Sequence, residues 1–431
     1  MKIILTVEVN SICSYPTLEV LSSHLHLFMK NKFALGIFSV LAAASASAQS
    51  LYYVDSEAQE SIPLKWVVGI NVIYDDNVSP GFGDKENSIS LNPYVGLSFV
   101  NISPQTTLDV FARLGLIYYL DAPTAAGASD VNSQSRVGVN LTHRFNERLR
   151  FSSRNFVSYE LEPDYSYAFA SSRATSEYFF WSTDNSIGYR WSERFATYTG
   201  IRFFGADYDI ANNDRTSWEL YNQLRYQLGP QTVLTGDYRY GQTKGDGVSS
   251  DSSDQFLLAG VEHRFSPNTI GIFRAGAQFR DVDEGSSTTS PYLELTVNSQ
   301  VNTAFSVRAF GRYGIEGYDT VQIVDGRLAE YDDRRTVRVG IGADYVISPT
   351  LSLFSGLDYI PSSFNSGRGI DTKASVDDLS EDIINAYIGV NVKINDFLTG
   401  TASYSYTNSS SDIMGRDYDR NRISVGLSAE F

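Results

Sequence analysis

The last nine residues of the chain, Ile423-Ser424-Val425-Gly426-Leu427-Ser428-Ala429-Glu430-Phe431, decide the fold class. Apolar side chains occupy every second position, and small or charged side chains occupy the positions between them. A period of two places these sets on opposite faces of a β-strand. The pattern therefore predicts a β-strand with one apolar face and one polar face.

The same alternation recurs upstream in segments of about ten to fifteen residues, for example at 108–118, 337–345 and 384–394. Such segments are longer than most strands of soluble proteins and match the length that crosses a bilayer at a tilt. No Asp, Glu, Lys or Arg falls at the centre of an apolar face, and several apolar faces end in Tyr or Trp. Aromatic residues at both ends are typical of membrane strands. The pattern favours a membrane barrel over a soluble sandwich, which also alternates.

Composition excludes several other classes of protein. Of the 431 residues, 42% are hydrophobic and 13% aromatic, which is too rich for a disordered chain. A net charge of -16 argues against nucleic-acid binding, because that needs a basic surface. The longest apolar run, 33–44, is too short for a transmembrane helix.

The residues before the alternating pattern have the parts of a secretory leader. After Met29, two lysines precede an apolar stretch that ends in Ala46-Ser47-Ala48. We expect translation to start at Met29 and cleavage to follow Ala48, so that 1–48 comprise an upstream extension and a signal peptide. A longer, atypical leader is the alternative. Residues 49–63 would then form a short periplasmic segment.

Short turns and long polar loops alternate along the rest of the chain. Eight short turns, such as 102–105, alternate with nine polar loops, of which 361–380 is the longest. These connect eighteen strands, and an even count lets an antiparallel sheet close without an edge. We expect an all-β, transmembrane, antiparallel up-and-down barrel of about 18 strands (16 to 18) over 64–431. Its short turns would face the periplasm and its loops the exterior, with 361–380 as the best candidate to narrow the pore.

Three short motifs lie at strand ends: Val72-Ile73-Tyr74-Asp75-Asp76-Asn77, an Arg-aromatic pair before several short turns, and the closing Val425–Phe431. With these motifs the chain resembles the β-barrel porin type 2 family of outer-membrane proteins. The ending also looks like the signal read by the barrel-assembly machinery, with Gly426 and Phe431 in the expected places. The resemblance covers the whole mature chain and implies a passive channel with no catalytic residues.

The period-two alternation of the predicted strands places many charged side chains on the polar face. Those expected to line the pore are Arg113, Arg136, Arg154, Arg202, Arg239, Arg274, Arg308, Arg312, Arg338, Asp237 and Asp344. Bases outnumber acids at these inner positions, whereas the loops hold most of the acidic excess. Two interpretations stay open. The arginines either pair across strands for structural reasons or bias the wall towards anions and acidic solutes.

Few residues are suited to catalysis or metal binding. Without residues 1–48 the chain has no Cys and two His, His143 and His263, which excludes disulfides and thiolate metal sites. Both histidines fall on the apolar face beside a turn, away from any substrate-facing pocket. We therefore expect no enzyme activity, no metal and no cofactor.

Eighteen strands enclose enough room for an aqueous path. The sequence predicts an outer-membrane porin-like channel for passive diffusion of small hydrophilic solutes, with a mild preference for anions or acidic solutes. Its partners would be outer-membrane lipid, the barrel-assembly machinery and the solutes. The alternative is an anchor, assembly or adhesion barrel whose acidic loops bind a partner without transport. The oligomeric state is not indicated.

Overall fold

The computed structural model describes residues 61–431, except 81–84, 122, 124–128, 162–176, 210–213, 246–250, 284, 286, 318–320 and 325. The expected start at Met29, the signal peptide and residues 49–60 lie outside the described residues. All regular elements of the described part are β-strands. No helix there is long and apolar enough to cross a membrane.

Nineteen strands follow one another along the chain. They are β1 (Ile62–Asp75), β2 (Ser88–Ile102), β3 (Thr106–Tyr119), β4 (Val131–Arg144), β5 (Leu149–Glu160), β6 (Tyr178–Arg190), β7 (Phe195–Tyr208), β8 (Arg215–Gly229), β9 (Thr232–Gly245), β10 (Ser252–Ser266), β11 (Thr269–Val282), β12 (Ser287–Asn302), β13 (Phe305–Glu316), β14 (Val321–Val324), β15 (Arg327–Ser348), β16 (Leu351–Gly369), β17 (Leu379–Lys393), β18 (Leu398–Ser411) and β19 (Tyr418–Glu430). The short β14 pairs only with β15 and is not part of the wall. Eighteen strands therefore form the barrel, as the sequence predicted.

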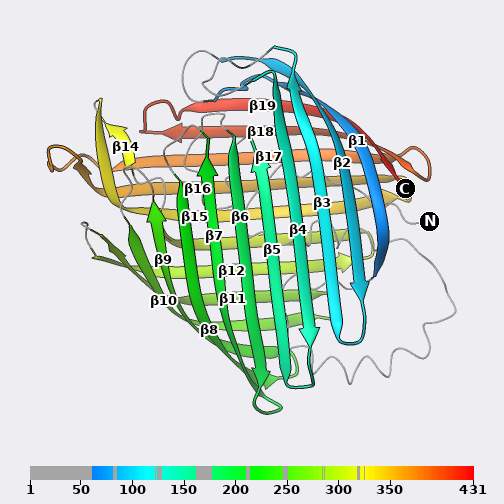
Figure 1. The fold of residues 1–431 in the computed structure, drawn as a ribbon, viewed down its shortest axis with the longest axis horizontal. Helices are drawn as coiled ribbons and strands as arrows, with labels where there is room; N and C mark the ends of the chain where they lie inside the picture. The colour runs from blue at the N-terminus through cyan, green and yellow to red at the C-terminus, as the bar shows by residue number, and fades with distance from the viewer. Residues whose placement is uncertain are drawn as a thin grey trace.

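Each wall strand pairs antiparallel with its neighbours in the chain, and β1 pairs with β19 to close the sheet. At this seam, Trp66 and Phe431 exchange two backbone hydrogen bonds of 3.0 and 2.8 Å. The short turns and the C-terminus lie at the same end of the barrel (Figure 1). Closure leaves no sheet edge, which is the condition for β-structure in lipid.

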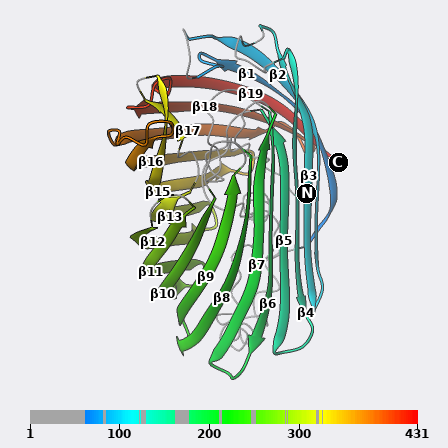
Figure 2. The ribbon, with the colours of Figure 1, turned by 60° about the vertical axis from the view of Figure 1, so that its left-hand side comes forward.

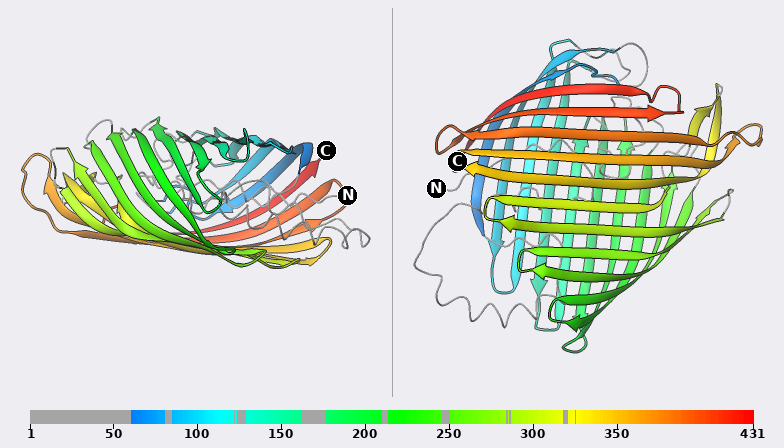
Figure 3. Two further views of the ribbon diagram at one scale, coloured as in Figure 1. Left: turned by 90° about the horizontal axis from the view of Figure 1, so that it is seen from below. Right: turned by 180° about the vertical axis from the view of Figure 1, so that it is seen from behind.

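The strands are tilted relative to the barrel axis. In Figure 1 the front wall, blue to green, runs across the back wall, yellow to red. The views from the side in Figure 2 and from below and behind in Figure 3 show the same crossing. Tilted strands of a closed barrel cross in this way when front and back are seen together.

Burial is the reverse of that in a soluble protein. Large apolar side chains point outward and are exposed, for example Leu257 at 63% and Leu114 at 59%. Charged side chains point inward and are buried, for example Arg225 at 3% and Glu262 at 4%. Water would strongly disfavour so continuous an apolar surface, whereas hydrocarbon accepts it. The structure is thus an all-β transmembrane barrel.

Outward aromatic pairs border this apolar belt beside the short turns. The rings of His143 and Phe145 lie 4.6 Å apart, and those of His263 and Phe265 lie 4.7 Å apart. Each histidine Nδ1 is hydrogen-bonded to a threonine hydroxyl of the neighbouring strand, at 2.8 and 2.9 Å. Both histidines therefore face outward at the turn end of the barrel.

One expectation about the loops was wrong. Residues 361–369 of the expected longest loop belong to β16, and β15 already begins at Arg327. The paired ends of these two strands therefore extend past the ends of the neighbouring strands. The apolar side chains within this extension explain why it is ordered as strand. Phe364 and Tyr331 are fully buried with Ala329 and Ile413. The β1 strand also begins at Ile62, two residues earlier than expected.

Candidate functional site

The inner face of the barrel is the candidate site. The register of neighbouring strands and the alternation of exposed and buried residues place all eleven predicted lining residues on the face opposite the apolar belt. Their distribution around the barrel is uneven. The inner faces of β5–β12, here called the charged wall, hold two networks of ion pairs.

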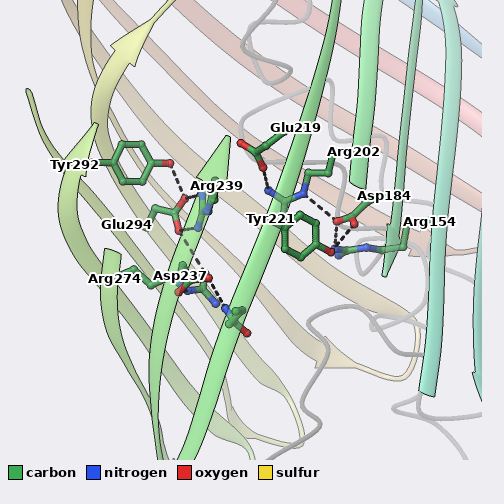
Figure 4. Close-up of polar contacts among 11 residues, drawn as sticks. Arg154, Asp184, Arg202, Glu219, Tyr221, Asp237, Arg239, Arg274, Tyr292 and Glu294 are labelled. Atoms are coloured by element: carbon green, nitrogen blue, oxygen red, sulfur yellow. Dashed lines mark hydrogen bonds and ion pairs between the residues drawn. The ribbon is translucent and has the colours of Figure 1, made fainter. Parts of the chain in front are cut away.

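The first network, the Asp184 cluster, spans β5–β8. It consists of Arg154, Asp184, Arg202, Glu219 and Tyr221 (Figure 4). The strand register sets Arg154 directly beside Asp184, Asp184 beside Arg202, and Arg202 beside Glu219. Opposite charges therefore alternate along one row that crosses four strands.

Short contacts join the members of this row. Arg154 Nη2 lies 2.7 Å and Arg202 Nε 3.1 Å from Asp184 Oδ2, and Arg202 Nη1 lies 2.6 Å from Glu219 Oε1. The Tyr221 hydroxyl donates a hydrogen bond to Asp184 Oδ1 at 2.8 Å, and the Tyr221 ring packs against the Arg202 guanidinium. Each charged group has an opposite charge within hydrogen-bonding distance, so the cluster is fixed in place.

The second network, the Arg274 cluster, spans β8–β12. It consists of Arg225, Asp237, Arg239, Glu262, Arg274, Tyr292 and Glu294. Arg225 donates bidentate hydrogen bonds to Glu262 at 2.7 and 2.5 Å, and Arg239 donates bidentate hydrogen bonds to Glu294 at 3.0 and 3.2 Å. Arg274 lies 3.4 Å from Glu262, 3.3 Å from Glu294 and 3.7 Å from Asp237, and so links the three acids.

Arg312 on β13 and Arg338 on β15 are direct neighbours of the same charge. Glu316 offsets their repulsion. Arg338 donates two hydrogen bonds to its carboxylate at 2.7 and 3.0 Å, and Arg312 also pairs with it. The structure thus brings two predicted lining residues together through an acid that the sequence analysis did not single out.

The remaining predicted residues lie elsewhere on the inner face. Arg136 pairs with Glu160 at 2.6 and 2.8 Å, and Arg113 stacks over the Tyr94 ring at 3.7 Å. Arg308 stands between Asn298 and Gly342 in the register, and Asp344 on β15 stands beside Ser306. These arginines therefore belong to neither cluster.

The sequence analysis also missed charged residues near the strand ends. Inward-facing examples are Asp75, Glu160, Asp254, Glu316, Arg334, Glu381 and Arg420. Asp254 accepts a hydrogen bond from Arg280 at 2.9 Å, and Asp75 accepts one from Arg422 at 2.9 Å. Counting by twos to the end of each strand would have found them. Because several are acids paired with arginines, the excess of base on the wall is smaller than the sequence suggested.

The opposite side of the barrel has a different lining. The inner faces of β17, β18, β19, β1 and β2, here called the neutral wall, carry uncharged residues at mid-height, among them Gly69, Asn71, Asn92, Tyr94, Gly389, Ser403, Ser405, Ser424 and Gly426. Their charged residues, such as Glu381 and Glu430, lie towards the strand ends. In the order of the sheet, the neutral wall is about half a circuit from the middle of the charged wall. The interior is therefore polar all round but charged at mid-height mainly on one side.

No family model and no curated protein matches the sequence. Several solved structures are similar in fold. OccAB4 of Acinetobacter baumannii is 14% identical over 86% of this chain and 99% of its own, with a TM-score of 0.43. OpdK of Pseudomonas aeruginosa with vanillate is 13% identical over 85% and 99%, with a TM-score of 0.43. The siderophore receptor PirA of Acinetobacter baumannii is 8% identical over 87% and 81%, with a TM-score of 0.44.

The cellular location of the protein follows from the properties of the barrel. A closed sheet whose outward belt is apolar and whose inner face is polar fits only a membrane that holds β-barrels. The protein is therefore an outer-membrane β-barrel.

Within the described residues, no group of three or more His, Cys, Asp or Glu is placed to hold a metal ion.

Proposed function

We propose that this protein is a porin-like channel for passive diffusion of small hydrophilic solutes. The observation that carries the proposal is a polar and charged inner face around a closed wall of eighteen strands. Barrels of sixteen to eighteen strands are wide enough for a water-filled path, whereas eight strands would be filled by side chains. The resemblance of the strand-end motifs to the β-barrel porin type 2 family supports the same function.

We further propose a mild preference for anions or acidic solutes. Paired charges on the Asp184 and Arg274 clusters largely cancel, so the preference would come from other arginines of the inner face. Arg308, for example, has the uncharged Asn298 and Gly342 as register neighbours. Guanidinium groups that line the inner face attract anions through the low-dielectric wall.

Liposomes that contain the folded protein test both parts. Swelling in isotonic sugar and amino-acid solutions should be fast compared with empty liposomes, and the reversal potential in a KCl gradient should indicate a modest anion preference. A cation preference would contradict the anion proposal and leave the channel intact. No swelling with correctly folded barrel would contradict the channel and favour the anchor or adhesion alternative.

We also propose that Gly426 and Phe431 carry the signal for the barrel-assembly machinery, and that the mature chain begins after Ala48. Phe431→Ala should reduce the amount of barrel inserted in cells, because the machinery reads the end of the last strand. Refolding of the same variant from urea into vesicles should be nearly unchanged. N-terminal sequencing of the protein from outer membranes checks the cleavage site.

A further inference from the structure

A group of polar side chains faces lipid on β5, β6, β7 and β8. The group consists of Ser153, Asn155, Thr183, Asn185, Thr199 and Asn222 and is called here the outer polar patch. Its outward direction follows from residues two positions away, because these share a face of the strand. Val157, Ile187 and Leu224 are such neighbours of the three asparagines, and they are 37%, 53% and 47% exposed.

The patch lies at the middle of the apolar belt. Phe151 and Tyr159 flank it on β5, and Phe179 and Ile187 flank it on β6, all on the outward face. The strands are paired so that Asn155 is beside Thr183, and Thr199 is beside Asn222. Between β6 and β7 the register places Ile201 beside Asn185 and Ile187 beside Thr199, so Asn185 and Thr199 are diagonal neighbours. The patch thus consists of two adjacent polar groups near the middle of the membrane strands, where polar side chains are least tolerated.

The rest of the outward surface differs. Near the middle of their strands, β1, β2, β3 and β17 present the apolar residues Ile70, Pro93, Leu114 and Ile388 on the outward face. Within the described strands, the three asparagines are the only amide side chains that face outward more than four residues from a strand end. The patch is therefore a local feature of one side of the barrel.

Hydrogen bonds inside the patch satisfy only part of its polar groups. Asn155 Nδ2 donates to Ser153 Oγ at 3.0 Å, and Ser153 Oγ donates to Asn185 Oδ1 at 2.7 Å. Asn185 Nδ2 donates to Thr183 Oγ1 at 2.6 Å, and Asn222 Nδ2 donates to Thr199 Oγ1 at 2.6 Å.

A side-chain amide offers two N–H donors and one oxygen with two acceptor positions. In the described part of the chain, each asparagine of the patch thus keeps one N–H without a partner, and the amide oxygens of Asn155 and Asn222 accept no hydrogen bond. Lipid tails offer neither donors nor acceptors. Contact with lipid is therefore unfavourable for these groups, and contact with another protein surface that supplies hydrogen bonds is favourable.

We propose that the outer polar patch is the contact surface of a homodimer, in which a second copy of this chain packs its own patch against it about a two-fold axis. The unsatisfied groups include both donors and acceptors, so the patch is complementary to itself, as a two-fold contact requires. A second copy also lies at the same depth in the bilayer, which brings its patch to the same level.

The surroundings of the patch fit such a contact. The strands β5–β8 lie side by side along one wall (Figure 2). Phe179, Trp181, Phe203 and Trp218 are outward-facing aromatic residues of these strands on the loop side of the patch. Hydrogen bonds between membrane segments with small or polar side chains stabilise their association, and aromatic residues are enriched at protein contacts.

Disulfide cross-linking in outer membranes tests the contact directly. With Cys13→Ser in the background, Asn185→Cys should form a cross-linked dimer on mild oxidation. The matched control is Ile388→Cys, which is outward at mid-strand on β17 and 55% exposed. It should stay monomeric. Equal cross-linking at both positions, or none at Asn185→Cys, would overturn the proposal.

Replacing the amides by leucine provides an independent test. The triple variant Asn155→Leu, Asn185→Leu, Asn222→Leu should fold, as judged by heat-modifiable migration, because leucine suits a lipid-facing position. Its dimer should dissociate on the order of tenfold to a hundredfold more readily than the parent in detergent, measured by analytical ultracentrifugation. A monomeric parent, or a triple variant that dimerises equally well, would contradict the proposal.

Discussion

The charged wall and the neutral wall both present a polar inner face, but they do so with different residues. Both must hold polar groups against water on one face while the other face touches lipid. The charged wall uses networks in which arginines and acids alternate, whereas the neutral wall uses glycine, serine and asparagine. The difference indicates that a polar lining does not need charge. Ion pairs placed on one side of the interior instead fix long side chains and set the local field.

The largest effect is expected from breaking the Arg274 cluster. Glu262→Ala removes the carboxylate that pairs with the almost fully buried Arg225, and one of the acids that pair with Arg274. An uncompensated buried charge costs about 3–5 kcal/mol. Urea unfolding in vesicles should register this loss, whereas Ser403→Ala on the neutral wall should change stability by less than about 0.5 kcal/mol. Equal effects on the two walls would contradict the comparison.

A smaller effect is expected at the seam within the neutral wall. A Cβ at Gly426 would lie 2.1 Å from Asn71 Oδ1, so Gly426→Ala should cost about 1–3 kcal/mol through overpacking. Combining it with Asn71→Ala should cost less than the sum of the two single changes, because the clash disappears. Strict additivity would show that the glycine serves a purpose other than packing against Asn71.

Charge changes on the two walls should alter ion selectivity by similar amounts. Glu219→Gln leaves one more net positive charge in the Asp184 cluster, and Ser403→Arg adds one to the neutral wall. A unit charge about 10 Å from a permeating ion changes its energy by roughly 0.4 kcal/mol in water, or about twofold in permeability ratio. Reversal potentials should shift towards anions in both variants. A shift with Ser403→Arg alone would place the charged wall outside the ion path.

The smallest effect is expected at the rim above the neutral wall. The Ser380 hydroxyl and backbone N–H donate hydrogen bonds to Asp412 at 2.6 and 2.9 Å and lower the pKa of this exposed carboxyl. A lowered pKa stabilises the fold above the ordinary carboxyl range, and the contribution is lost as pH falls through the lowered value. Asp412→Asn should change the free energy of unfolding in urea at pH 7 by no more than a few tenths of a kcal/mol and abolish that pH dependence.

The sequence predicted the fold well because alternation records two environments residue by residue. Arg154, Arg202 and Arg274 were assigned to the inner face by parity alone, and the eighteen strands follow from turns and loops. It did not predict that β16 continues to Gly369, because loop polarity hid the buried Phe364. Nor did it identify the outer polar patch, since these positions carry amides and hydroxyls, and no charged residue marks a break in the apolar face.

The partners within each cluster lay beyond sequence reasoning. Parity gives the face of a strand but not which residues of neighbouring strands lie opposite one another. The row from Arg154 to Glu219 depends on the register of three separate strand pairs, and a shift of one residue in any of them would separate the charges. For the same reason the balance of charge on the inner face could not be judged from a list of arginines.

Single-channel recording in a planar bilayer tests the central claim most directly, namely that the inner face surrounds a continuous aqueous path. The folded barrel should insert with discrete, stable conductance steps that grow in proportion to KCl concentration. A correctly folded, heat-modifiable protein that inserts and yet gives no ionic current would contradict the account.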